Sequence, residues 1–261
     1  MARLVAALGR NAVDSLGLVG ALARFSGRTL SRGISLRPSA LSIDAKVFFN
    51  QVWFSGVQAL PLVAVIAVLI GGASIIQSVN LLTGVADAII GTLLVSIIIR
   101  ELGPLIVAII LVGRSGTAMA AELGYMRLQG EIEVLEAHRI DTFAFVVAPR
   151  ALAATAAMFA LIIVFDVMGI LGGALIAVAL KDVSLNLLLS RVLRSLTNAD
   201  VLSSALKALL FGQAVAIPAC FYGLRVRRSA TELPQAVTQA VVFSLVALFL
   251  LDIVLAAIFY L

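Results

Sequence analysis

Two adjacent charges, Arg100 and Glu101, lie within an apolar run of this chain and are followed by Gly103 and Pro104. A charged side chain at the centre of a bilayer costs about 2.5–3.5 kcal/mol on insertion scales, so such residues pair or line polar cavities. Neighbours on a helix point about 100° apart and can reach different partners. Two interpretations remain open: the pair lines a substrate cavity, or it holds helices together. Pro104 also frees a carbonyl one turn back, near Arg100, which predicts local kinking.

A second group of charges follows in the more polar residues 113–142. In a helix over 128–139, Leu128, Ile132 and Leu135 would form an apolar stripe beside an acidic one. Six of the fourteen acids of the chain lie in residues 100–141: Glu101, Glu122, Glu131, Glu133, Glu136 and Asp141. A short helix with one apolar and one acidic edge suits the groove of a basic soluble partner. An ordinary solvated loop helix is the alternative, and the acidic bias favours the docking surface.

The composition defines the class of protein that must hold these residues. Hydrophobic residues make up 62% of the 261 residues and charged residues 13%, with a mean hydropathy of +1.15. Several apolar runs reach the ~20 residues needed to cross a bilayer core. The sequence therefore predicts an all-α integral membrane protein. No cleavable signal peptide is expected, and the single cysteine, Cys220, excludes an internal disulfide.

The order of elements follows from the hydropathy pattern. Residues 1–46 are expected to form an interfacial amphipathic helix and a linker, because arginines and apolar side chains occupy opposite helical faces. The transmembrane domain would then occupy 47–261. Its five expected membrane-spanning segments lie at about 52–79, 85–112, 151–180, 201–224 and 236–261. The first contains Pro61 and the pair Gly71-Gly72, which predicts a kinked or partly re-entrant helix. The short helix that would contact a soluble partner is expected within the connection 115–142.

Arginine and lysine positions predict the orientation. With a cytoplasmic N-terminus, fourteen basic residues fall inside: Arg3, Arg10, Arg24, Arg28, Arg32, Arg37, Lys46, Arg114, Arg127, Arg139, Arg150, Arg225, Arg227 and Arg228. Four fall in outside loops or nearby helix ends, namely Lys181, Arg191, Arg194 and Lys207. The bias places the connection 115–142 in the cytoplasm and the C-terminus outside.

Two further acids, Asp166 and Asp252, lie well inside apolar segments. A proton-coupled secondary transporter could use them as a relay, but structural hydrogen bonds are the favoured interpretation. The chain lacks the G-x-x-x-x-G-K-[ST] loop, so it cannot hydrolyse ATP by a P-loop of its own. It also lacks the metal-binding and nucleophile motifs of hydrolases and lipid transferases, so an enzyme is not expected.

The stretch RELGPLIVAIILVGRSGTAMAAELGYMRLQGEIEVLE resembles the signature of the MlaE/YrbE permeases. The matching residues of the second half are Gly113, Arg114, Gly116, Ala118, Ala121, Glu122, Leu123, Gly124 and Met126. The likeness extends to the amphipathic N-terminus, to VVAPR at 146–150 and to the end of the chain. It implies a homodimeric permease of an ABC transporter in the bacterial inner membrane, which moves phospholipid or a related lipid and serves outer-membrane lipid homeostasis and asymmetry.

The resemblance also implies partners and residue roles. A cytoplasmic ATPase dimer would bind ATP and Mg²⁺, this chain would hold no cofactor, and a periplasmic MCE-domain protein and often a STAS-domain subunit would complete the complex. The substrate-binding residues would be Arg100, Glu101 and Pro104. The residues that couple to the ATPase would be Glu122, Gly124, Glu131, Glu133, Leu135 and Glu136. The alternatives are the proton-coupled transporter using Asp166 and Asp252 and a structural scaffold for a lipid-transfer protein.

The sequence departs from the family pattern at two places. Gln129-Gly130 replaces a more usual non-glycine polar pair before the acidic helix. AHRID stands where relatives often have an ending like MG[VI]DP, so Arg139 and the missing proline predict an altered exit from this helix.

Overall fold

The computed structural model describes residues 24, 25, 27, 41–81, 95–181, 190, 192–227 and 229–260. These residues form helices and short connections, without a strand among them. Five helices are long and apolar enough to cross a membrane: Val47–Ser74, Ile98–Leu128, Phe143–Ile176, Asn198–Gly223 and Glu232–Phe259. The all-α membrane fold expected from the sequence is confirmed.

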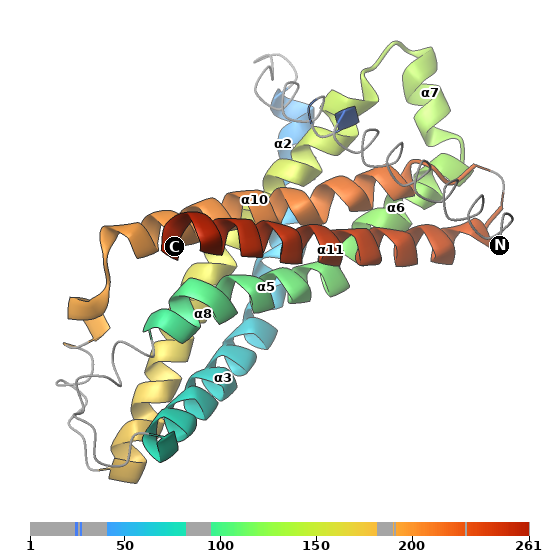
Figure 1. The fold of residues 1–261 in the computed structure, drawn as a ribbon. Helices are drawn as coiled ribbons and strands as arrows, with labels where there is room; N and C mark the ends of the chain where they lie inside the picture. The colour runs from blue at the N-terminus through green and yellow to red at the C-terminus, as the bar shows by residue number, and fades with distance from the viewer. Residues whose placement is uncertain are drawn as a thin grey trace, which may run out of the picture.

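The first membrane-spanning segment is a single crossing with a break near its start. It consists of α2 (Leu41–Ser55), the 3₁₀ turn η1 (Val57–Ala59) and α3 (Leu60–Leu81). The break directly precedes Pro61, where the sequence predicts a kink. At the other predicted position, Gly71 and Gly72, α3 continues unbroken. The segment then follows α8 along the molecule (Figure 1). An unbroken α3 of 22 residues favours a full crossing over the re-entrant alternative.

Glycines bring α3 and α8 (Ala148–Lys181) into close contact. A Cβ atom at Gly71 would overlap the carbonyl oxygen of Gly169, and one at Gly172 would lie 2.8 Å from the Cα of Val68. Helices in lipid gain no hydrophobic driving force from association, so small residues that allow close packing hold them together. Gly71 and Gly72 thus serve helix packing rather than kinking.

The second segment extends further than the sequence predicts. It runs through η2 (Val95–Leu102), α5 (Gly103–Leu111), η3 (Val112–Gly116) and α6 (Thr117–Leu128). The expected end near residue 112 is wrong because the small and polar residues after it continue the helix. The connection to the next segment therefore begins after Leu128 rather than at residue 115. Arg100 and Glu101 lie in η2, one turn before Pro104.

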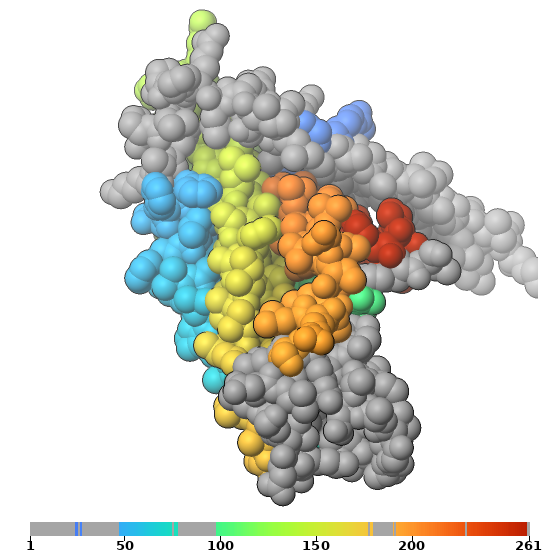
Figure 2. Space-filling model, turned by 90° about the vertical axis from the view of Figure 1, so that its left-hand side faces the viewer, coloured from blue at the N-terminus to red at the C-terminus, as the bar shows by residue number. Residues whose placement is uncertain are grey.

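The remaining elements complete a bundle. After α7 (Glu131–Ala137), the π-helical η4 (Phe143–Val147) leads into α8. The last two spans, α10 (Asn198–Gly223) and α11 (Glu232–Tyr260), lie side by side, and α7 projects beyond them (Figure 1). Figure 2 shows the first segment, α8 and α10 next to one another on one face.

Most of the predicted interfacial helix lies outside the described residues. Of residues 1–40 only Arg24, Phe25 and Gly27 are described, and they are helical. The Phe25 ring centroid lies 4.9 Å from that of Phe143 and 5.5 Å from that of Phe221. Helix α2 begins at Leu41, so the end of the predicted linker is already part of the first helix.

The close approach at Gly71 predicts the effect of one added methyl group. Gly71→Ala should lower the melting temperature of the detergent-purified protein, because overpacking costs about 1–3 kcal/mol. Gly113→Ala is the matched control: a Cβ there meets no atom within 4 Å. Equal melting temperatures for the two variants would contradict the close contact of α3 with α8.

Candidate functional site

The centre of the candidate site is a backbone carbonyl that the following proline leaves without its helical donor. In a regular helix the N–H of residue 104 would bond to the carbonyl of Arg100, but proline has no N–H. The ammonium of Lys207 donates to this carbonyl oxygen at 2.7 Å. The freed carbonyl near Arg100 was predicted from the sequence; its donor was not.

Lys207 also binds two carboxylates. Its Nζ lies 2.8 Å from Oδ1 of Asp252 on α11 and 3.2 Å from Oε2 of Glu101. The lysine side chain is fully buried, whereas 40% of the Glu101 side chain is exposed. Because an unpaired buried ammonium is costly, these acids and the carbonyl offset the burial of the Lys207 side chain.

Arg100 pairs with a different residue of α10. Its Nε lies 2.7 Å from Oδ1 of Asp200, and its Nη2 donates to Oδ2 at 3.2 Å. Asp200 also caps α10, accepting from the backbone N–H of Thr197 at 2.9 Å and from its hydroxyl at 2.8 Å. This capping box fixes the carboxylate to the start of the helix, so Arg100 binds a rigid partner.

The network bears on the two interpretations of Arg100 and Glu101. Both residues join η2 to α10, as structural pairing requires. Their side chains nevertheless remain 27% and 40% exposed, so each presents polar atoms to the surroundings. Pro104 is buried, and it contributes to the network because it has no N–H to bond to the carbonyl of Arg100. Pairing and an exposed polar surface therefore coexist, and the substrate-binding role remains a prediction.

Lys207 lies within α10, inside the span expected at 201–224. Asp252 has this lysine as a partner, in line with a structural role. For Asp166 no hydrogen bond of Oδ1 is found within the described residues, although the atom is buried. The carboxylate lies against Gly103, where a Cβ would be 2.8 Å from Oδ1. The structural hydrogen bond favoured for Asp166 is thus not observed at Oδ1.

Each of the three π-helical segments contains or lies close to a buried or partly buried arginine. Arg100 is in η2, Arg114 is in η3, and Arg150 follows η4. Short π-helical segments inside α-helices occur frequently at functional sites. Arg114 donates to the carbonyl of Phe54 at 2.7 Å and to Oε1 of Gln58 at 2.8 Å. It therefore joins η3 to the break in the first segment.

Two predicted coupling residues, Glu122 and Gly124, lie in α6 and not on the short acidic helix. Arg150 of α8 donates from Nη2 to the Glu122 carboxylate at 2.8 Å and from Nη1 to the carbonyl of Val146 at 3.0 Å. Gly124 is buried, and a Cβ there would overlap the side chain of Leu233. Both residues thus join α6 to other helices, Glu122 through a half-exposed pair and Gly124 through close packing.

Helix α7 carries the other four predicted coupling residues. Ile132 is buried, and Leu135 packs against the cluster of Leu123, Val146, Val147 and Cys220. Glu131, Glu133 and Glu136 are exposed, and Glu133 lies 3.2 Å from Nη1 of Arg127. Within α7 the predicted apolar and acidic edges are present, but the single helix expected over 128–139 is wrong, because Leu128 ends α6 and the chain turns at 129–130. Leu135 belongs to the inward edge, so a partner would meet the glutamates and the exposed Val134.

Both ends of α7 depend on left-handed backbone positions. Gly130, with φ of 76°, allows the chain to turn out of α6. At the other end Arg139 has φ of 59°, and the N–H groups of Ile140 and Arg139 bond to the carbonyls of Leu135 and Glu136, both at 3.0 Å. These bonds form a Schellman motif, in which glycine usually occupies the position of Arg139. The two departures from the family pattern thus coincide with the turns that bound α7.

Sequence reasoning missed Lys207, Asp200 and the pairing of Arg150. One signal was available: a freed carbonyl in an apolar helix requires a donor, and Lys207 is the one lysine in a described membrane-spanning helix. The partners of Arg100 and Arg150 come from distant parts of the chain, which helical periodicity alone does not identify.

The five apolar helices and the ion pairs between them define a multi-pass α-helical membrane protein. The profile of the family described as Permease MlaE matches residues 48–258. The chain belongs to this family of permeases.

Individual relatives also align with most of the chain. The chain is 30% identical over 258 residues to the intermembrane phospholipid transport system permease protein MlaE of Haemophilus influenzae, covering 98% of this chain and 97% of the relative. A probable ABC transporter permease protein of Rickettsia prowazekii is 29% identical, with 97% and 96% covered. The chloroplastic protein TRIGALACTOSYLDIACYLGLYCEROL 1 of Arabidopsis thaliana is 30% identical, with 81% and 61% covered.

The buried lysine predicts a large effect of removing its charge. Lys207→Met should destabilise the protein by about 3–5 kcal/mol, because Asp252 and the Arg100 carbonyl lose their donor. Adding Asp252→Leu should recover part of this loss, since the uncompensated carboxylate is then absent. Denaturant unfolding in detergent measures both; strictly additive effects of the two substitutions would contradict a direct pair.

The left-handed Arg139 predicts a stabilising substitution. Arg139→Gly should slow amide hydrogen exchange in 134–137 by about fivefold, because relieving this conformation contributes about 1 kcal/mol. His138→Gly is the matched control: φ of His138 is −82°, so glycine brings no relief there and exchange should accelerate. Faster exchange in Arg139→Gly would show that the arginine side chain stabilises the turn.

Proposed function

We propose that this chain is the permease subunit of an ATP-driven ABC transporter that moves phospholipid or a related hydrophobic lipid. The observation that carries the proposal is one helical run, 95–128, with the network of Arg100 and Glu101 near its start and acidic α7 beyond its end. The name of the Haemophilus influenzae relative supports phospholipid as the substrate. The names of the Rickettsia relatives support the ABC class.

The energy source in this proposal is a partner. A cytoplasmic ATPase dimer binds ATP and Mg²⁺, because the sequence has no P-loop. It seats on α7, where Glu131, Glu136 and Val134 are exposed together and offer an acidic edge around one apolar side chain. A basic groove with an apolar centre would complement this surface.

The substrate end of the proposal is the network around Lys207. Two copies of the chain would enclose a lipid cavity open to the periplasm, and the half-exposed side chains of Arg100 and Glu101 would face the lipid head group. A periplasmic MCE-domain protein would exchange lipid with this cavity, and a STAS-domain subunit could complete the complex. The N-terminus would be cytoplasmic and the C-terminus periplasmic, in the inner membrane of a bacterium, where transport serves lipid homeostasis.

Movement would pass between the two ends along the second segment. Segments η2 and η3 interrupt its α-helical hydrogen bonding at Arg100 and Arg114. A helix with such interruptions can shift its local register at a small cost, whereas a regular α-helix moves as a rod. Arg114 would transmit a shift to the break in the first segment through the carbonyl of Phe54.

The acidic edge of α7 gives the test. The double variant Glu131→Lys with Glu136→Lys should abolish copurification of an ATPase with the chain, because two repelling cations replace the acids at the interface. In the reconstituted complex, lipid-stimulated ATP hydrolysis should fall to the basal level.

The matched control adds two lysines to the neighbouring connection. Ala230→Lys with Thr231→Lys changes exposed residues outside α7 and should leave ATPase binding intact. Undiminished lipid-stimulated hydrolysis in the α7 variant would refute the docking role, and lipid transport by the purified chain alone in a pH gradient would favour the proton-coupled alternative.

A further inference from the structure

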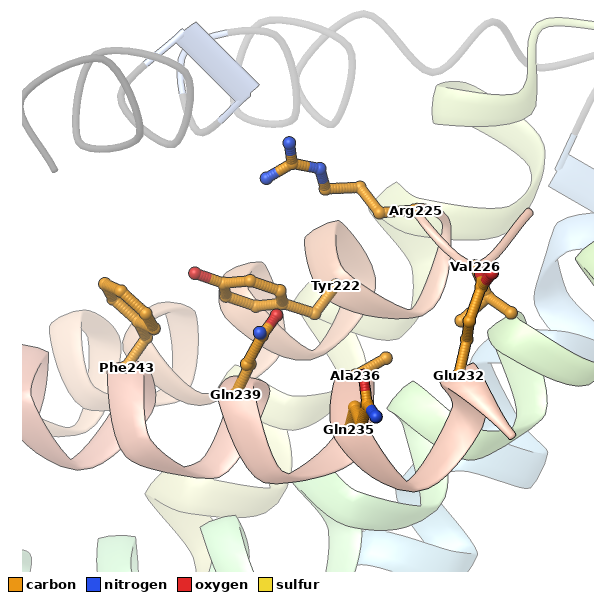
Figure 3. Close-up of a pocket in the computed structure, with 8 residues that line it drawn as sticks. All are labelled: Tyr222, Arg225, Val226, Glu232, Gln235, Ala236, Gln239 and Phe243. Atoms are coloured by element: carbon orange, nitrogen blue, oxygen red, sulfur yellow. The ribbon is translucent and has the colours of Figure 1, made fainter. Parts of the chain in front are cut away.

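A polar pocket of about 380 Å³ lies where α10 ends and α11 begins. Its volume falls within the range of small-molecule sites, about 300–1,000 Å³. The lining residues that matter here are Tyr222, Arg225, Glu232, Gln235, Gln239 and Phe243 (Figure 3). None of them belongs to the Lys207 network or to α7.

The hydroxyl of Tyr222 lacks a hydrogen bond within the described part of the chain, although the residue is only 2% exposed. Buried hydroxyls nearly always have a partner, and leaving one unsatisfied costs about 1–3 kcal/mol. The ring is fixed between Phe221 and Phe243, whose centroids both lie 5.3 Å away. A rigidly held, unpartnered donor in a pocket indicates that a ligand atom completes its bonding.

Arg225 adds a positive charge above this hydroxyl (Figure 3). Its guanidinium carbon lies 5.0 Å from the centroid of the Phe221 ring. Stacking on an aromatic face positions the guanidinium without using its N–H donors. Among the described residues no carboxylate lies within ion-pair distance of Arg225, so the donors can serve a ligand.

The remaining polar groups complete an anion-binding surface. Gln235 and Gln239 are exposed and lie one turn apart on α11, where their amides add donors. The one acid, Glu232, lies beside Val226, away from Phe243 (Figure 3). Its carboxylate accepts the backbone N–H of Arg227 at 3.0 Å. The Tyr222 hydroxyl, the Gln239 amide and the Arg225 guanidinium thus lie toward the Phe243 end of the pocket and the carboxylate at the other end (Figure 3).

The surroundings favour a lipid over a soluble anion. The pocket lies between Gly223, where one membrane-spanning helix ends, and Glu232, where the next begins. From Val242 onward, α11 exposes a run of apolar side chains that also includes Val246, Phe249 and Leu250. Acyl chains could pack along this run while a head group occupies the pocket, and basic pockets between membrane helices are known to bind lipid head groups.

We propose that this pocket binds the phosphodiester of a membrane phospholipid, with Tyr222, Arg225 and Gln239 as donors and the acyl chains along α11. The site is distinct from the transport cavity and needs no ATPase. Its binding can therefore be measured whether or not the proposed transport function holds.

The test is a titration of the purified full chain in mild detergent with dioleoylphosphatidylglycerol, followed by native mass spectrometry. Tyr222→Phe removes one oxygen and keeps the ring, so it should weaken binding about fivefold; Arg225→Gln should weaken it about tenfold. Arg227→Gln, in the same connection but outside the pocket, should bind as the unmodified chain does. Dioleoylglycerol, which has the same chains without phosphate, should bind about tenfold more weakly.

Two results would overturn the proposal. The first is unchanged phosphatidylglycerol affinity in both Tyr222→Phe and Arg225→Gln. The second is equal affinity for dioleoylglycerol together with inorganic phosphate binding that depends on Tyr222 and Arg225, which would assign the pocket to a soluble anion. Melting temperatures of the variants, compared with that of Arg227→Gln, show that each one is folded.

Discussion

The structure depends on one missing hydrogen bond. Pro104 cannot donate to the carbonyl of Arg100, and in a bilayer no water replaces the donor, so the protein must supply one. It uses the ammonium of Lys207, at 2.7 Å. A buried ammonium in turn requires carboxylates, and these come from Glu101 and Asp252. The proline in the second span thereby determines contacts with both α10 and α11.

The same helix joins the two places where charge concentrates. Its 95–128 run carries π-helical segments at Arg100 and Arg114 and ends one turn before the acidic α7. Close packing surrounds this run: Gly103 lies against α8 and Gly124 against α11. Such contacts leave little freedom for the helix to tilt, so a register shift at the π-helical segments is the motion most compatible with the packing.

The sequence predicted the helices better than the side-chain contacts between them. Apolar runs of sufficient length identified five spans, and the periodicity of α7 identified its two edges. The extension of the second span to Leu128 was not predicted, because polar residues such as Arg114 and Glu122 lower its hydropathy. Their bonds to Phe54 and Arg150 are visible only in the three-dimensional structure. The freed carbonyl of Arg100 could be deduced from local chemistry, but not its donor over 100 positions away.

The charge balance of the network bears on where a substrate would act. Two cations, Arg100 and Lys207, face three carboxylates, those of Glu101, Asp200 and Asp252. Asp200 is fixed by its cap, and Asp252 lies closer to Lys207 than Glu101 does, at 2.8 Å against 3.2 Å. Glu101 is also the most exposed of the three. The least compensated negative charge is therefore the one on the helix that leads to α7, so a ligand that binds or displaces Glu101 would alter the Lys207 contact at the carbonyl of Arg100.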